Sequence, residues 1–221
     1  MEIAGFVKNS MIDYPKHIAC VVFTPGCNMN CFYCHNKHIN IKGKRIPEEE
    51  VLDYIAQNKG FLEGVVVSGG EPTLQSDLYY FIKKIKRMGL KVKLDTNGTN
   101  VTIVKKLLKD KLLDFVAMDI KAPFDRYKEI TRTDDDMKSV IALKNLLLKG
   151  VVDYEFRTTF VNSLYNEDMI KIAKNLKGAK ALAIQKYRPC DSTGMMRDDS
   201  EQNWAAIAAE KFVRAVIKRG L

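Results

Sequence analysis

The sequence predicts an α/β fold in which a parallel sheet forms either a partial, open barrel or a doubly wound sheet. First, short apolar or β-branched segments alternate six times with segments of helical periodicity, a pattern typical of parallel strands joined by right-handed crossovers. Second, the chain has 221 residues, whereas a closed eight-stranded barrel typically takes about 250. Third, no linker, repeat or low-complexity stretch divides the sequence, so we expect a single domain over residues 1–221.

The six strands are expected where β-branched or apolar residues cluster between turn residues. They cover residues 18–23, 64–69, 91–96, 115–120, 154–160 and 181–187. Residues 3–15, before the first of them, fit an additional N-terminal hairpin.

The helices between the strands have readable ends. Pro47 and three following glutamates begin one helix, which Gly60 ends. Ser76 begins the next, whose apolar face recurs at helical spacing and which Gly89 follows. That face consists of Leu78, Phe81, Ile82 and Ile85. Further helices are expected near residues 101–111, 137–149 and 166–177, with a last one from about Ser200 to Lys218.

Composition excludes several classes of protein. There is no apolar run of 18 residues and no basic-then-apolar N-terminus typical of a secretory signal, so we expect a cytoplasmic protein without a membrane segment. The net charge of +9 comes mostly from lysines scattered over amphipathic helices. Nucleic-acid binding favours arginine and stacking aromatic residues in a shared stripe, and we therefore expect no nucleic-acid partner.

Polar residues follow the expected strands at their carboxyl ends, where α/β proteins place their sites. We expect these segments to meet at one rim of the sheet, because a buried Asp or Arg is costly without a partner. They are the loop 24–36, SGGEP at 68–72, DTNG at 95–98, DIK at 119–121, Arg157, and the segment 185–189 with Gln185 and Arg188.

Three of the five cysteines, Cys27, Cys31 and Cys34, lie within eight residues. In a reducing compartment this spacing favours a metal site over disulfides. Zinc would need a fourth ligand such as His35, which is adjacent to Cys34, and a ferredoxin site would need a fourth cysteine. Three thiolates on a four-iron cluster would leave one iron open. Cys20 lies in an apolar run and is expected to be a buried thiol; the role of Cys190 stays open.

The C-x3-C-x2-C spacing, with Tyr33 before the last cysteine and GGEP after the next strand, resembles the signature of the radical S-adenosylmethionine (SAM) enzymes. The resemblance implies a partial (β/α)6 barrel, with Cys27, Cys31 and Cys34 holding a [4Fe-4S] cluster. SAM would complete the cluster at the open iron and be cleaved reductively to a 5′-deoxyadenosyl radical.

The segments CHN, DTNG and DIK together resemble the activating enzymes of glycyl radical enzymes, especially anaerobic ribonucleoside-triphosphate reductase activating proteins. This resemblance implies that the radical abstracts hydrogen from a glycine Cα of a partner glycyl radical enzyme, with a flavodoxin-like or other low-potential reductant. For the methionyl part of SAM, it places Gly69, Gly70 and Glu71 at the amino group and Asp119, Ile120 and Lys121 at the carboxylate. Asp95 with Asp119 would hold a monovalent cation. Tyr33, Cys34 and His35 would border the adenine, Asn36 would lie near the cofactor, and Arg157 and Arg188 would be further contacts.

Two departures from relatives are visible. Formate-lyase activators have a Tyr-His pair where this chain has Tyr187-Arg188, and the ferredoxin insert of some activators is absent. Three alternatives stay open: a radical SAM enzyme acting on a small molecule, such as a carboxy-deazaguanine synthase; a zinc-binding interaction module; and an electron-transfer protein.

Overall fold

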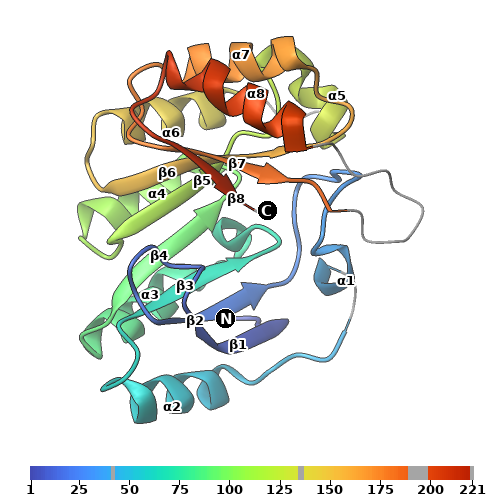
Figure 1. The fold of residues 1–221 in the computed structure, drawn as a ribbon. Coiled ribbons are helices and arrows are strands. Elements are labelled where there is room, and N and C mark those ends of the chain that lie inside the picture. The colour runs from blue at the N-terminus through green and yellow to red at the C-terminus, as the bar shows by residue number, and fades with distance from the viewer. Residues whose placement is uncertain (41–42, 134–136, 189–198, 220–221) are drawn as a thin grey trace. The chain divides into compact units, whose positions relative to one another are not determined.

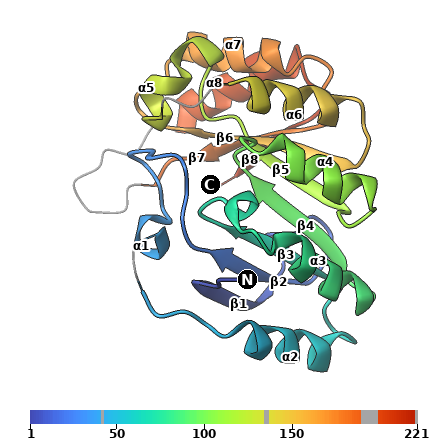
Figure 2. The same ribbon diagram turned by 180° about the vertical axis from the view of Figure 1, so that it is seen from behind.

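The structure is a computed structural model that describes residues 1–40, 43–133, 137–188 and 199–219. The contacts of the chain divide it into two compact units. Unit 1 contains Met1–Asn28 and Asn36–Ala117, and unit 2 contains Met29–His35 and Met118–Leu221. The cysteine loop therefore contributes Cys27 to unit 1, and Cys31 and Cys34 to unit 2. Figures 1 and 2 show the elements of both units.

Unit 1 contains the N-terminal strands. Strand β1 pairs antiparallel with β2, and β2, β3 and β4 pair in parallel. The hairpin expected within residues 3–15 is therefore wrong: that segment contains one strand, β1, which pairs with the first predicted strand, β2. The elements are β1 (Gly5–Ser10), β2 (Ala19–Thr24), α1 (Lys37–Asn40), α2 (Glu48–Asn58), β3 (Gly64–Gly69), the 3-10 turn η1 (Pro72–Leu74), α3 (Leu78–Arg87), β4 (Lys91–Thr96) and α4 (Val101–Lys109).

Strand β5 (Phe115–Asp119) crosses the boundary between the units in the sequence. Within unit 1, Asp114 N donates to Val92 O at 2.9 Å, which joins the start of β5 to β4. Within unit 2, Ile120 N donates to Arg157 O at 2.8 Å, so the chain just beyond β5 is bonded to β6.

Unit 2 continues the alternation, with β6, β7 and β8 paired in parallel. In both views α7 and α8 lie on one face of these strands (Figures 1 and 2). The elements are the 3-10 turn η2 (Phe124–Arg126), α5 (Tyr127–Thr131), α6 (Lys138–Leu148), β6 (Asp153–Phe160), α7 (Asn166–Asn175), β7 (Leu182–Lys186), α8 (Asp199–Glu210) and β8 (Val216–Arg219). The described strands confirm the α/β fold with parallel strands, in an open rather than a closed sheet.

The C-terminal end of the last predicted helix is also wrong. The sequence predicts a helix that reaches Lys218, but α8 ends at Glu210 and the chain then forms β8. The β-branched pair Val216 and Ile217 fits a strand better than a helix. Leu182 N donates to Ala215 O at 3.0 Å, so the segment pairs with the edge of β7.

The core follows the sequence pattern. Leu78, Phe81, Ile82 and Ile85 are all buried, which confirms the apolar face predicted for α3. Cys20 is also buried, and its burial raises the pKa of its thiol to about 12, which confirms that it is an inert core residue at neutral pH. Within the described residues, no helix is both long and apolar enough to cross a bilayer.

Arg219 on β8 forms a two-pronged ion pair with Glu155 on β6. Arg219 Nη1 and Nη2 each donate to one Glu155 oxygen at 2.8 Å, and the Glu155 side chain is 2% exposed. A bidentate pair of this kind is strong and geometrically specific. It attaches the terminal strand to the second unit.

We expect Arg219→Met to lower the free energy of unfolding by about 2 kcal/mol, because it leaves a buried carboxylate without its counter-charge. The exposed Lys218→Met on the same strand is the control, with a change within about 0.5 kcal/mol. Adding Glu155→Leu to Arg219→Met should recover most of the loss in urea unfolding. An Arg219→Met variant as stable as the unmodified chain would contradict the assignment.

Candidate functional site

The GGEP loop after β3 is bonded through its backbone to the loop that carries Cys27. Gly70 N donates to Thr24 O, and Glu71 N donates to Gly26 O, both at 2.8 Å. Gly69 has φ +126°, and a Cβ on it would lie 2.2 Å from Thr24 N and 2.3 Å from Thr24 O. Only glycine permits this approach of the two loops.

Asn36 bonds to the same loop. Its side-chain amide donates to Gly69 O at 2.9 Å. Two residues expected at the cofactor therefore meet within unit 1: Asn36, which follows Cys34 in the cysteine loop, and Gly69, the last residue of β3.

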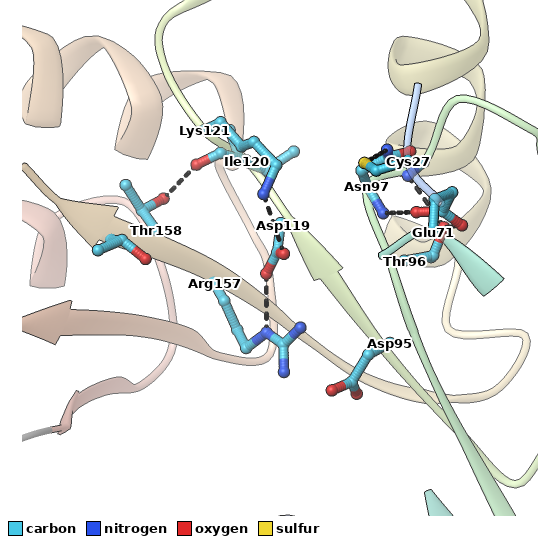
Figure 3. A network of polar contacts seen from close by, with 12 residues as sticks. Cys27, Glu71, Asp95, Thr96, Asn97, Asp119, Ile120, Lys121, Arg157 and Thr158 are labelled. Atoms are coloured by element: carbon cyan, nitrogen blue, oxygen red, sulfur yellow. Dashed lines mark hydrogen bonds and ion pairs between the residues drawn. The ribbon is translucent and has the colours of Figure 1, made fainter. Parts of the chain in front are cut away.

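The Glu71 side chain is fully buried and accepts four hydrogen bonds within unit 1. Thr73 N and Thr73 Oγ1 donate to Oε1 at 3.1 and 2.5 Å, and Thr96 Oγ1 donates to Oε1 at 2.8 Å. Asn97 N donates to Oε2 at 2.6 Å. Burial raises the pKa of Glu71, whereas the four donors oppose that rise because they favour the charged carboxylate. The carboxylate thus joins the GGEP loop to the DTNG loop (Figure 3).

The DTNG loop in turn reaches Cys27. Asn97 Nδ2 donates to Asn28 Oδ1 at 2.9 Å and lies 3.9 Å from Cys27 Sγ, within reach of a hydrogen bond to sulfur (Figure 3). Asn97 was not among the individually predicted cofactor residues, although its place within the DTNG segment expected at the rim was a signal that could have included it. Amide donors of this kind support the thiolates of iron–sulfur sites.

Asp95, the first residue of DTNG, is held by two neighbours. Lys93 Nζ lies 2.5 Å from Asp95 Oδ1, and Ser68 Oγ donates to Oδ2 at 3.1 Å. Ser68 belongs to the SGGEP segment expected at the rim, whereas Lys93 was not a predicted site residue. A lysine two positions before a rim aspartate was the available signal for Lys93.

In unit 2, Asp119 lies between two cations. Lys121 Nζ is 3.2 Å from Asp119 Oδ2, and Arg157 Nε is 2.8 Å from Oδ1 (Figure 3). Burial is the largest single influence on the pKa of Lys121 and lowers it, but Asp119 and the other acidic groups around the ammonium together raise the pKa well above its ordinary value, so the ammonium stays charged. Ile120 O accepts a hydrogen bond from Thr158 Oγ1 at 2.7 Å, which fixes the DIK segment against β6. The structure thus brings together three residues that were expected at one rim: Asp119, Lys121 and Arg157.

The second half of the cysteine loop packs within unit 2. Cys31 and Tyr33 are buried, and Asn30 N donates to Thr131 O at 3.0 Å. Burial raises the pKa of the Cys31 thiol, and Lys121 opposes that rise. Cys34 N donates to Cys31 O at 3.2 Å, which closes a turn that carries both cysteines.

His35 contacts the end of β7. Its ring stacks on Tyr187 with centroids 6.2 Å apart and planes 15° apart, and its Nε2 lies 2.5 Å from Arg188 O. Arg188 therefore contacts the cysteine loop through its backbone, and its side chain is exposed. Cys190 lies outside the described residues.

The side chains of the cysteine motif are of the chemical kind that an iron–sulfur cluster takes as ligands. Cys27 has an amide beside it in unit 1, and Cys31 is electrostatically coupled to an ammonium in unit 2. Within the described residues, no three His, Cys, Asp or Glu side chains are arranged to hold one metal ion. Thiolates are the ligands that iron–sulfur clusters prefer.

We expect Gly69→Ala to destabilise the protein by about 3 kcal/mol, because a Cβ adds both left-handed strain and a collision with the Thr24 backbone. Gly89→Ala is the matched control: its φ is +85° but nothing lies within 4 Å of a Cβ, so only strain of about 1 kcal/mol is expected. Thermal or urea unfolding measures both. Equal losses in the two variants would show that the close approach is unimportant.

We expect Glu71→Gln to cost about 2–3 kcal/mol although it keeps the shape of the side chain. Backbone N–H groups donate to both Glu71 oxygens, so in either orientation the new amide nitrogen faces a donor. The exposed Glu50→Gln is the control, and urea unfolding is the measurement. A Glu71→Gln variant of unchanged stability would mean that the carboxylate does not join the loops.

Comparison with known proteins identifies the superfamily of the chain. The model of the radical SAM superfamily matches residues 21–177. The solved structure of Streptococcus suis SuiB bound to S-adenosylmethionine covers 90% of this chain at a TM-score of 0.66 and 15% identity, which shows the fold alone. This chain spans 47% of that one.

Three curated relatives cover most of the chain. A Methanocaldococcus jannaschii protein assigned as a glycyl-radical enzyme activating enzyme is 40% identical over 86% of this chain and 81% of its own. A pyruvate formate-lyase-activating enzyme of Clostridium pasteurianum is 31% identical over 89% and 90%. A 7-carboxy-7-deazaguanine synthase of Thermoplasma acidophilum is 38% identical over 64% and 66%. With a matching family model over most of its length and relatives of this similarity, the chain belongs to the radical SAM superfamily.

Proposed function

We propose that the chain is a radical SAM activating enzyme that generates a glycyl radical on a partner enzyme. The observation that carries the proposal is the cysteine motif bonded through the backbone to the GGEP loop, in a chain whose relatives named as activating enzymes align over more than four-fifths of its length. The proposed partner is an anaerobic ribonucleotide reductase, because the motifs of the chain resemble the activating proteins of that enzyme most. Tyr187-Arg188, in place of the Tyr-His pair of formate-lyase activators, disfavours pyruvate formate-lyase as the partner.

In this proposal Cys27, Cys31 and Cys34 hold a [4Fe-4S] cluster. When bound, the cluster and SAM supply reductive cleavage to methionine and a 5′-deoxyadenosyl radical, which takes a hydrogen atom from a glycine Cα. The protein supplies binding, orientation and exclusion of water. Its +9 charge favours an acidic, flavodoxin-like reductant through electrostatic steering.

The chain's own residues have separable tasks. The Gly69 and Gly70 backbone would present carbonyl groups to the methionyl amino group, and Glu71 would hold that backbone in place rather than bind SAM itself, because its oxygens are occupied by internal donors. Lys121 and Arg157 would present positive charge to the methionyl carboxylate while Asp119 orients them. Tyr33, Cys34 and His35 would border the adenine, with Arg188 at the same edge.

A second candidate is a radical SAM enzyme acting on a small molecule, as the similarity to a 7-carboxy-7-deazaguanine synthase suggests. The cluster and the SAM residues would be shared. The two candidates differ in the acceptor of the radical, so a partner protein or a small molecule must be tested directly.

We expect anaerobically reconstituted protein to bind about four irons and, once reduced, to release 5′-deoxyadenosine and methionine from SAM. Cys27→Ala, Cys31→Ala and Cys34→Ala should each abolish iron binding and SAM cleavage, whereas Cys20→Ala should retain both. Iron analysis and chromatography of the products measure the outcome. Stoichiometric zinc without iron would support an interaction module, and a cluster that never cleaves SAM would support an electron carrier.

We expect a glycyl radical doublet in the EPR spectrum when the reduced protein is mixed anaerobically with SAM and its partner. A partner with its radical glycine changed to alanine is the control and should give no doublet. Turnover of a small molecule, with every glycyl radical enzyme of the same organism left silent, would favour the second candidate.

A further inference from the structure

Strand β4 carries a buried lysine that the proposed function has not used. The Lys93 residue is 1% exposed, and its ammonium lies 2.5 Å from Asp95 Oδ1. The Asp95 side chain is 12% exposed. A lysine is rarely buried to this extent unless it is paired.

The surroundings of Lys93 give its charge little access to water. Lys93 pairs in register with Val66 of β3, and Val66 belongs to an apolar cluster with Tyr14, Ala19 and Val21. Residues paired in register on neighbouring strands point to the same face, so Lys93 lies on the face of Val66 and its cluster. Asp95, two residues further along β4, shares that face. A charge beside such a cluster needs a nearby counter-charge.

Asp95 is one of the two residues, with Asp119, that the resemblance places at a monovalent cation. Its Oδ1 already faces the Lys93 ammonium, and its Oδ2 accepts a hydrogen bond from Ser68. A sodium or potassium ion on the same carboxylate would lie close to a fixed positive charge in a weakly screened environment, which is unfavourable. The residues present therefore do not fit a separate monovalent cation at this carboxylate.

We infer that the Lys93 ammonium is a built-in cation that replaces a monovalent metal ion at Asp95. Lys93 is then a positioning residue: it neutralises Asp95 and fixes the start of the DTNG loop, so that SAM binding does not depend on sodium or potassium. This inference rests on the proposed function for SAM binding, but the pairing itself can be tested without SAM.

The test compares potassium chloride with tetramethylammonium chloride at equal ionic strength, because tetramethylammonium is too large to enter such a site. For the unmodified protein we expect the same melting temperature in both salts, and a SAM dissociation constant that differs by less than about twofold. For Lys93→Met we expect SAM binding at least about tenfold weaker in tetramethylammonium, with recovery as potassium is added.

The cluster-free Lys93→Met protein supplies a readout that is independent of activity. Its melting temperature should rise saturably with potassium and stay constant with tetramethylammonium, because the ion would bind only the folded carboxylate. Lys91→Met on the same strand, whose exposed side chain contacts His17, is the matched control and should show no potassium response. Lys93→Met combined with Asp95→Asn removes both charges and should lose the response.

Two results would overturn the inference: an unmodified protein whose SAM binding or melting temperature requires potassium, or a Lys93→Met protein that binds SAM normally and ignores potassium. If Lys93→Met does not fold, the potassium dependence of the unmodified protein and of the double variant still tests the inference. If no variant binds or cleaves SAM, the proposed function fails, while the potassium response of the cluster-free proteins continues to test the role of Lys93.

Discussion

The buried carboxylate of Glu71 is the constraint on which the arrangement of unit 1 depends. Its four donors come from the GGEP loop itself and from the DTNG loop, so neither loop can move without exposing or orphaning a charge. The Glu71 amide is in turn bonded to Gly26, one residue before Cys27. Through its backbone amide and its side chain, Glu71 thereby links the loop of Cys27, the first proposed cluster ligand, to two loops expected at the cofactor.

Unit 2 also has a carboxylate that orders its neighbours, but there the neighbours are two charged side chains rather than neutral hydrogen-bond donors. The Asp119 carboxylate forms ion pairs with both Lys121 and Arg157. The two cations are therefore held in fixed positions, and each has a counter-charge. The aromatic residues after Cys31 and Cys34 pack on the ends of α5 and β7, which explains why this half of the cysteine loop belongs to unit 2. Each unit therefore carries a carboxylate that orders neighbouring groups rather than reacting.

Much of this architecture could be predicted from the sequence because local patterns decide it. The alternation of strand and helix, the apolar face of α3 and the burial of Cys20 follow from periodicity and composition. Strand β8 itself did not follow, because the segment from Val216 becomes a strand only by pairing with the edge of β7.

The site was predicted less completely, for a related reason. GGEP identified the loop, but the direction of the Glu71 side chain depends on Thr96 and Asn97, some 25 residues later in the chain. Likewise, the pairing of Lys93 with Asp95 could be suspected from their spacing, whereas the apolar cluster that makes it important is assembled from distant segments. Contacts of this kind are decided by the fold, and no local pattern reports them.

The most direct test of the account is Mössbauer spectroscopy of the protein reconstituted with ⁵⁷Fe, recorded with and without SAM. Three cysteines predict a cluster of four irons, one of which lacks a protein thiolate. We expect the signal of one iron in four to change when SAM is added, while the other three stay constant. A spectrum that SAM leaves unchanged, or one of four equivalent thiolate-bound irons, would contradict the central claim that this chain holds an open cluster for SAM.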